Sequence, residues 1–524
     1  MLKRSLLLLI VLPALAFMPV HAFAQDQQLD LILYNGTVVD GSGSPAVKAD
    51  VGIQGDRIVF VGAPEKGGGT RPGKLIAKRT IDATGLIITP GFIDPHTHTA
   101  ADLSDPKRSR NDAYLMQGVT TVATGNDGAS PTHIGETLAQ WNKQGIGTNA
   151  VLFIGQGTVR SEVMGMSDAK PTPAQIDRMK SLVDTAMNEG AIGMSTGLYY
   201  APGSYSSTEE VIELAKVAAA HHGIYDTHMR DESSYNIGLI AAVRETNRIG
   251  QEAHLPVMIS HIKALGADVW GQSADVIAII NAARKAGIDI VASQYPYTAS
   301  GTSVVAALVP RWAEADGKLV QNLHDPALHE KLVAEMTENL HRRGGADTLL
   351  MTSSKDKSII GKTLAQIATE RKESPIDAAI EISANGDSSV ASFNMKESDI
   401  EAFMRQPWVM TCSDGSSGHP RKYGTFPRKI HKYVYEEHII SLEAAVHSST
   451  LLPAQTLGLK ARGLLKPGYF ADVLVFDPKT YNERATYEQP ELLATGVRFL
   501  AVNGKLAIDN GELVSIKAGR ALSH

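Results

Sequence analysis

The pattern of apolar and polar residues divides the chain into two β-rich ends and a long middle section. Between residues 29 and 88, short runs of alternating apolar residues, such as 50–61, are broken by Asn-Gly and Gly-Asp turns. Alternation with a period of two and turns of these types are typical of antiparallel strands. The same pattern returns after Arg462, in runs such as 472–477. We therefore predict a small β-sandwich to which both ends of the chain contribute.

In the middle section, an apolar strand, a polar loop and an amphipathic helix follow one another repeatedly. The predicted strands are residues 87–98, 119–126, 148–157, 191–198, 224–230, 256–263, 288–297 and 408–415. Helical patterns at 208–221 and 274–286 separate several of them. Alternating β and α elements favour a parallel sheet, and eight such strands predict an α/β fold with a closed (β/α)₈ TIM-like barrel. The repetition stops between 301 and 349, where a helix-like segment predicts a subdomain inserted after strand seven.

The first 24 residues have the pattern of a targeting segment. Lys3 and Arg4 precede an apolar run, and Ala22-Phe-Ala24 supplies small residues at the spacing of a cleavage site. The run is short for a membrane span, Pro13 interrupts it, and no cysteine follows it for a lipid anchor. We predict a cleaved signal peptide, export to a bacterial periplasm or secretion, and no stable membrane anchor.

Composition adds limits to this picture. The 524 residues are 43% hydrophobic, which suffices for a large core, and the net charge of -6 comes without a basic tract. Nucleic acid is therefore excluded as a partner, and no pattern indicates an oligomeric state. The predicted organisation is a signal peptide (1–24), the N-terminal part of the sandwich (25–88), the barrel (89–455, insertion about 301–349) and the C-terminal part of the sandwich (456–524).

Polar residues gather where the predicted barrel strands end. They are His96 and His98 after strand one, Asp127 after strand two, His228 after strand five, His261 and Lys263 after strand six, and Asp414 after strand eight. A single histidine at a strand end is usually a hydrogen-bonding residue, and an aspartate before glycine is usually a turn former. Active sites of such barrels lie at the carboxyl ends of the strands, and histidine and carboxylate are usual zinc ligands. Four histidines together with Asp414 at one end of the barrel therefore indicate a metal site.

Six stretches carry a more specific signal. They are 90–98 (PGFIDPHTH), 195–203 (STGLYYAPG), 227–232 (THMRDE), 259–263 (ISHIK), 413–415 (SDG) and 419–428 (HPRKYGTFPR). In these stretches, and from about residue 29 to the C-terminal region, the chain resembles the D-aminoacylase (N-acyl-D-amino-acid deacylase) family of the amidohydrolase superfamily.

The resemblance implies a zinc hydrolase that cleaves the amide bond of a small N-acyl-D-amino acid, with one or two zinc ions (Zn²⁺) per protomer. By the family pattern, His228 and His261 would hold the tightly bound zinc, and His96 and His98 would form a second, weaker position. Asp414 would act as the general base on the water that the metal activates, and would pass the proton to the departing amine.

The resemblance also suggests how the substrate is held. Arg421 and Lys263 match family residues that bind the α-carboxylate, and a guanidinium suits bidentate recognition of this group. Tyr295 is a candidate for a third contact, and Tyr297 fits nearly as well. The alternative for Arg421 is that the basic residues between 421 and 429 form a solvated face.

Two positions depart from the family pattern. Asp127 stands where many D-aminoacylases have a cysteine that bridges the metals, and a carboxylate can bridge two cations while favouring harder ions. Gln156 stands where family members often have histidine, in a loop that we expect to contribute to the substrate pocket. The predicted fourth strand contains neither lysine nor glutamate, so it offers no carbamylated-lysine bridge. The sole cysteine, Cys412, lies in an apolar run, and we interpret it as a buried small hydrophobe.

Two alternatives stay open from sequence alone. The same chemistry would serve a related periplasmic amidohydrolase that acts on dipeptides with D residues or on cyclic amides. A non-catalytic, metal-containing binding protein would require that Asp414 or the histidines be unusable, and nothing in the sequence indicates this.

Overall fold

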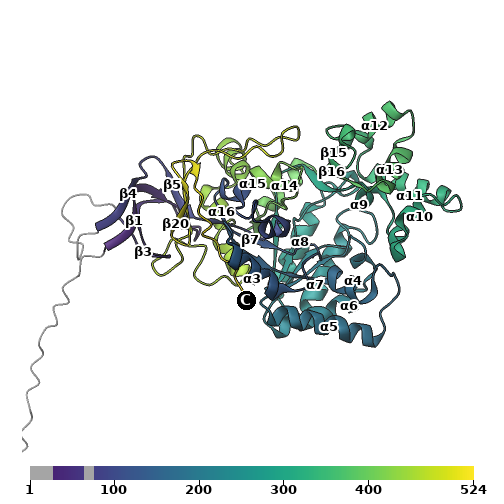
Figure 1. Ribbon diagram of the computed structural model, residues 1–524, viewed down its shortest axis with the longest axis horizontal. Helices are drawn as coiled ribbons and strands as arrows, with labels where there is room; N and C mark the ends of the chain where they lie inside the picture. The colour runs from purple at the N-terminus through teal and green to yellow at the C-terminus, as the bar shows by residue number, and fades with distance from the viewer. Residues whose placement is uncertain (1–27, 64–75, 524) are drawn as a thin grey trace, which may run out of the picture.

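The computed structural model describes residues 28–63 and 76–523, and the predicted signal peptide lies outside them (Figure 1). Within this part of the chain, no helix combines the length and the apolar character that crossing a membrane requires.

Parallel strands close into a barrel in the middle of the molecule. Around the barrel they are β6 (Phe92–Asp94), β7 (Val119–Thr124), β8 (Asn149–Leu152) continued by β9 (Ile154–Gly155), β10 (Gly193–Gly197), β11 (Ile224–His228), β12 (Val257–Ile259), β13 (Ile290–Gln294) and β17 (Val409–Thr411). Each strand pairs in parallel with the next. A parallel bridge between Thr97 and Gly415 joins the first strand to the last. The predicted barrel topology is therefore confirmed.

The barrel strands are buried on both faces because helices cover the outside of the barrel. Every residue of β7, β10 and β11 is buried, as expected for a parallel sheet between helices. The main covering helices are α3 (Ile134–Gln144), α5 (Pro173–Asn188), α6 (Thr208–Ala220), α7 (Leu239–Ala253) and α8 (Ser273–Lys285). The start of α5 is specified locally, since Thr172 and Gln175 form a capping box and Pro173 occupies the first helical position.

Shorter helices occupy the connections. They are α1 (Ala100–Ser104), α2 (Asp112–Leu115), α4 (Gln156–Met164), α14 (Glu397–Met404), α15 (Arg421–Ile430), α16 (Leu442–His447) and α17 (Leu451–Thr456). Of these, α15 follows the last barrel strand and carries Arg421 at its first position.

Strands from both chain ends form one sheet beside the barrel. Its order is β21 (Glu512–Leu513), β20 (Lys505–Asp509), β19 (Val497–Val502), β18 (Val473–Phe476), β5 (Ile87–Pro90), β1 (Gln28–Val38), β2 (Val47–Gln54) and β3 (Arg57–Gly62), with β4 (Ile76–Asp82) paired to β1. The two ends meet where β5 pairs antiparallel with β18. Figure 1 shows the purple N-terminal strands next to the yellow C-terminal ones. The first predicted barrel strand is thus divided, because β5 belongs to this sheet and only β6 to the barrel.

The inserted subdomain is longer than the predicted 301–349. It contains an antiparallel sheet of β14 (Ala299–Ser303), β16 (Ser388–Phe393) and β15 (Leu349–Ser354), with α9 (Val304–Leu308), α10 (Leu319–Leu323), α11 (His329–Arg342), α12 (Leu364–Arg371) and α13 (Pro375–Ala384). These elements share a hydrophobic cluster separate from that of the barrel. The difference arises because β15, the helices α12 and α13, and β16 follow one another along the chain in the strand-helix-strand order of a barrel unit. Only the pairing of β14 and β15 with β16 removes them from the barrel.

Candidate active site

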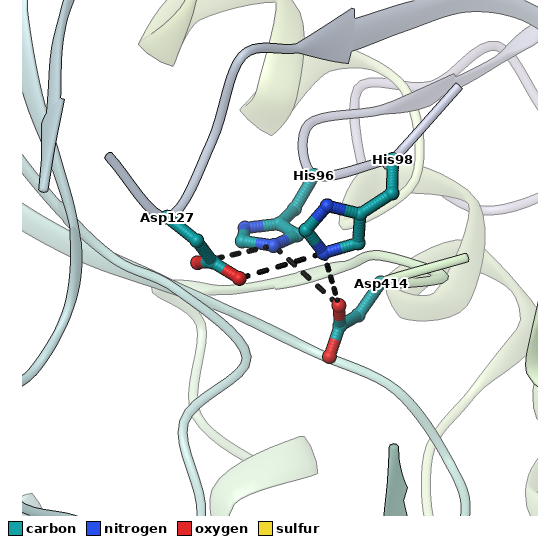
Figure 2. A group of neighbouring side chains, drawn as sticks. All are labelled: His96, His98, Asp127 and Asp414. Atoms are coloured by element: carbon teal, nitrogen blue, oxygen red, sulfur yellow. Dashed lines mark hydrogen bonds and ion pairs between the residues drawn. The ribbon is translucent and has the colours of Figure 1, made fainter. Parts of the chain in front are cut away.

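The predicted polar residues meet at the carboxyl ends of the barrel strands. His96 and His98 follow β6, Asp127 follows β7, His228 ends β11, and His261 and Asp414 follow β12 and β17. Figure 2 shows four of these side chains pointing toward one another from three separate segments. Asp127, His261 and Asp414 have positive φ values of 56°, 34° and 47°. Such backbone conformations are uncommon for non-glycine residues and occur in turns, helix ends and active sites.

Asp127 lies at the centre of the histidine cluster. Its Oδ1 atom is 3.5 Å from His96 Nε2, 3.4 Å from His261 Nε2 and 3.8 Å from His228 Nδ1. Its Oδ2 atom is 3.4 Å from His98 Nε2. Burial alone raises the pKa of Asp127, but the adjacent imidazoles outweigh this effect and lower it well below the usual range. One carboxylate therefore faces all four predicted histidines.

Asp414 faces the histidines from the opposite side. Its Oδ1 atom is 3.0 Å from His98 Nε2 and 3.6 Å from His96 Nε2. Its Oδ2 atom is 2.7 Å from Nη1 of Arg421. Burial raises the pKa of Asp414, whereas the charges of Arg421 and His261 lower it, and the net effect is a pKa far below the usual range. Asp414 is thus held in its ionised form in the centre of the site.

The donor set fits zinc. One ligand atom from each of His96, His98, Asp127 and Asp414 lies within 4.8 Å of the others, and the same holds for Asp127, His228 and His261. Both ring nitrogens of the fully buried His96 and Oδ1 of Asp127 have no hydrogen-bond partner among the described residues. Burial lowers the pKa of His228 to about 4, whereas the nearby carboxylates raise the pKa of His98 to about 10 and that of His261 to about 9, so a metal would have to displace a proton from these two imidazoles. Nitrogen and carboxylate ligands in this arrangement suit zinc, and two ions would share Asp127.

A glutamate that the sequence analysis missed supports two of the histidines. Oε1 of Glu232 lies 3.2 Å from His261 Nδ1 and 2.7 Å from Nζ of Lys263, and its Oε2 lies 3.5 Å from His228 Nε2. Lys263 is also 2.6 Å from His261 Nδ1. The signal was present in the sequence, because Glu232 ends the stretch that contains His228. Carboxylates that hold metal-binding imidazoles in place are a regular feature of metal sites.

The residues predicted to bind the substrate also lie together. The guanidinium of Arg421 lies 4.6 Å from the centre of the Tyr295 ring, and Lys263 Nζ lies 5.8 Å from it. The Tyr295 hydroxyl is buried and has no hydrogen-bond partner in the described part of the chain. Tyr297, by contrast, donates a hydrogen bond of 2.6 Å to Glu483. The structure therefore distinguishes the two tyrosines, and Tyr295 is the one that faces the site.

The solvated-face alternative for Arg421 is wrong, because its side chain is 1% exposed. Cys412 is fully buried, as predicted, and burial raises its pKa well above the ordinary value. The side chain of Gln156 does not line the cavity. It donates hydrogen bonds to Ser206 and Glu210, while the following residues of its helix form part of the cavity wall.

A cavity of about 750 Å³ opens above the cluster. Its floor includes His98, Asp127, His228, His261 and Asp414. One wall comes from the barrel loop of Tyr199 and Tyr200, whose rings lie 5.6 and 4.7 Å from that of His228. The other wall comes from the inserted subdomain. A cavity of this size accommodates a small-molecule substrate.

A (β/α)₈ barrel with a buried histidine and aspartate cluster at its strand ends defines a metal-dependent barrel hydrolase. The chain belongs to the Amidohydrolase family, which matches residues 79–508. It is 33% identical to D-aminoacylase of Alcaligenes xylosoxydans xylosoxydans, over 95% of this chain and 99% of that protein.

Two solved structures extend the comparison. A D-aminoacylase structure described for the functional role of its binuclear metal centre superposes with a TM-score of 0.80, at 33% identity over 95% of this chain and all of that chain. The N-acyl-D-glutamate deacylase of Bordetella bronchiseptica superposes with a TM-score of 0.80, at 29% identity and the same coverage. It contains zinc and a phosphonate inhibitor that mimics the tetrahedral intermediate.

Proposed function

We propose that this chain is a zinc-dependent hydrolase that cleaves N-acyl-D-amino acids into a carboxylate and a free D-amino acid. The observation that carries the proposal is the convergence of four histidines and two aspartates on one point below the cavity. The similarity to D-aminoacylase extends over 95% of the chain and supports the choice of substrate class.

His228 and His261 would hold one zinc ion, His96 and His98 a second, and Asp127 would contact both. Zinc bound there would polarise the amide carbonyl and lower the pKa of water toward neutrality. The neutral side chain of His228 and the carboxylate of Asp127 supply the ligand types that this ion prefers. Because Asp127 is a hard oxygen ligand, we expect the site to tolerate harder ions better than a cysteine-bridged one.

Asp414 would take a proton from the attacking water and deliver it to the nitrogen of the departing amino acid. Its position supports both steps, because the carboxylate faces His96 and His98 with one oxygen and the cavity residue Arg421 with the other. Proton transfer by such a carboxylate completes the hydrolysis: the acyl carbon gains the hydroxyl group of water and the amine leaves neutral.

Arg421, Lys263 and Tyr295 would hold the α-carboxylate of the substrate. Arg421 contacts Asp414 at 2.7 Å, so a substrate carboxylate at Arg421 would share this guanidinium with the base. Sharing weakens the stabilisation of ionised Asp414 and thereby raises its proton affinity once substrate is bound. The hydroxyl of Tyr295, buried beside both cations, would donate a further hydrogen bond to the same carboxylate.

Export through the N-terminal targeting segment completes the proposal. The apolar run after Lys3 and Arg4 supports it, and mass spectrometry of protein from the periplasmic fraction tests it. A mature chain that starts near Gln25 is expected, and an intact Met1 in that fraction would contradict cleavage.

The experiment for the activity compares enantiomers. Purified protein is incubated with N-acetyl-D- and N-acetyl-L-methionine, and the free amino acid is quantified before and after removal of metal by a chelator. We expect release from the D substrate alone, loss of activity on chelation and recovery on addition of zinc. Equal hydrolysis of both enantiomers, or activity that survives complete metal removal, would contradict the proposal.

A further inference from the structure

A buried arginine of the inserted subdomain forms part of the cavity wall. Arg343 follows the last residue of α11 and is 2% exposed. Its Nε donates to the hydroxyl of Tyr235 at 2.5 Å, and its Nη2 donates to the hydroxyl of Tyr199 at 3.1 Å. Its Nη1 lies 3.4 Å from Oγ of Ser300. The guanidinium is therefore held in one orientation at the surface of the cavity.

All of these partners are neutral. With the side-chain amide of Asn394 in its favoured orientation, its oxygen accepts from Nη1 of Arg343 at 3.1 Å, and this partner is neutral as well. Among residues 28–63 and 76–523, no carboxylate forms an ion pair with Arg343. The carbonyl groups at the end of α11 stabilise a cation there, but they do not neutralise it. A buried charge without a counterion is costly, which favours an anion from outside the chain.

The other two cations of the cavity differ in this respect. Arg421 is paired with Asp414 at 2.7 Å, and Lys263 is paired with Glu232 at 2.7 Å. Arg343 is thus the described cavity cation that lacks a carboxylate, and it belongs to a different part of the fold from the proposed α-carboxylate site.

Its distance from the cluster suits the far end of a substrate. The ring of Tyr199 lies 5.6 Å from that of His228, and the hydroxyl of the same tyrosine contacts Arg343. One aromatic side chain therefore separates the guanidinium from the histidines. The neighbouring wall carries the hydroxyl groups of Ser300, Thr302 and Ser389, which suit a polar group better than an apolar side chain.

We propose that Arg343 binds a second carboxylate of the substrate, so that the enzyme prefers acidic N-acyl-D-amino acids. This inference rests on the proposed function and specifies its substrate class. The side chain of D-glutamate and a dicarboxylic acyl group such as succinyl present the same chemistry to Arg343. A bidentate guanidinium contact recognises either of them.

The test uses two pairs of substrates that differ only in charge. N-acetyl-D-glutamate is compared with N-acetyl-D-glutamine. N-succinyl-D-alanine is compared with N-succinamoyl-D-alanine, in which the free carboxyl of the succinyl group is a primary amide. For the wild type, we expect kcat/KM to favour the acid by on the order of 100-fold in one of the two pairs, mainly through KM. A preference within the glutamate pair would show that Arg343 binds a carboxylate of the amino-acid side chain. A preference within the succinyl pair would show that it binds a carboxylate of the acyl group.

Arg343→Met is expected to remove this preference, and Arg343→Lys to retain part of it because the charge remains while the planar fork is lost. Arg342→Met is the matched control. Arg342 lies next in the chain, contacts Glu338 at 3.3 Å and is directed toward a second cavity. The Arg342→Met variant should keep the wild-type preference for the acidic substrate. Zinc content and thermal unfolding of each variant establish that it is folded.

Three results would overturn the inference alone, provided that the wild type hydrolyses N-acyl-D-amino acids. They are a wild type without acid preference in either pair, an Arg343→Met variant that keeps the preference, and an Arg342→Met variant that loses it equally. A wild type that hydrolyses none of the D substrates would overturn the proposed function and, with it, this inference.

Discussion

Replacing Asp127 tests the metal site directly, because one carboxylate faces all four histidines at 3.4–3.8 Å. Asp127→Asn keeps the size of the side chain. Asparagine also tolerates the left-handed backbone at φ 56°, so the substitution changes charge without imposing a new conformation. The expected effect is a loss of zinc affinity, since an amide oxygen is a weaker ligand than a carboxylate.

The structure gives the scale of this loss. Two unit charges about 4 Å apart interact by about 4 kcal/mol at an effective dielectric constant of about 20, which sets the scale for removing one carboxylate charge beside a bound cation. The amide dipole and the smaller desolvation cost of asparagine recover part of this energy. A net loss of about 3 kcal/mol corresponds to a roughly 100-fold higher zinc dissociation constant.

Zinc affinity is measured by competition with a chromophoric chelator. Asp316→Asn is the matched control, since Asp316 also has a positive φ of 55° and lies on the exposed surface of the subdomain. The control should bind zinc as the wild type does. A dissociation constant for Asp127→Asn within threefold of the wild-type value would refute the assignment of Asp127 as a metal ligand.

Two further predictions concern single buried groups. Burial lowers the pKa of Lys429 from 10.5 to about 7, and its ammonium contacts only the hydroxyl groups of Thr411 and Ser448 within the described residues. Since the unfolded chain binds this proton up to about pH 10.5, wild-type stability should fall as the pH decreases from about 10.5 to about 7. Lys429→Met should therefore raise the free energy of unfolding, measured by denaturant titration, by about 3 kcal/mol at pH 7 and have little effect on it at about pH 10.5. An equal effect at both pH values would contradict the lowered pKa of Lys429. Tyr295→Phe should raise KM for an N-acyl-D-amino acid about tenfold without loss of stability, because its hydroxyl has no partner among the described residues. Tyr297→Phe, which removes the hydrogen bond to Glu483, should instead lower stability. If Tyr297→Phe raised KM and Tyr295→Phe lowered stability, Tyr297 would be the tyrosine that contacts the substrate.

Most of the barrel could be predicted because short strand patterns that end in polar residues recur between helical patterns along the chain. β7, β10 and β11 follow this order, and all of their residues are buried. The extent of the subdomain could not be predicted in this way. Its strands and helices alternate along the chain as barrel units do, and only the pairing of β15 with β16, through hydrogen bonds distant in sequence, separates them from the barrel.

The histidine cluster was predictable for the same reason, since strand ends in a barrel converge on one point. Contacts that depend on how loops approach one another could not be predicted from the sequence. Glu232 stands four residues after His228, yet its contact with Lys263 requires two strands to be placed side by side. Arg343 comes from the subdomain, more than a hundred residues beyond His228 in sequence, and nothing near it in the chain marks it as a cavity residue.

The central claim is that Asp414 transfers the proton in a zinc-dependent deacylation. The most direct test determines zinc per protomer and kcat on N-acetyl-D-methionine for the wild type and for Asp414→Asn. The account predicts that the variant retains zinc at the His228 and His261 position while kcat falls about 1,000-fold. A zinc-loaded Asp414→Asn variant with a kcat close to that of the wild type would contradict the account.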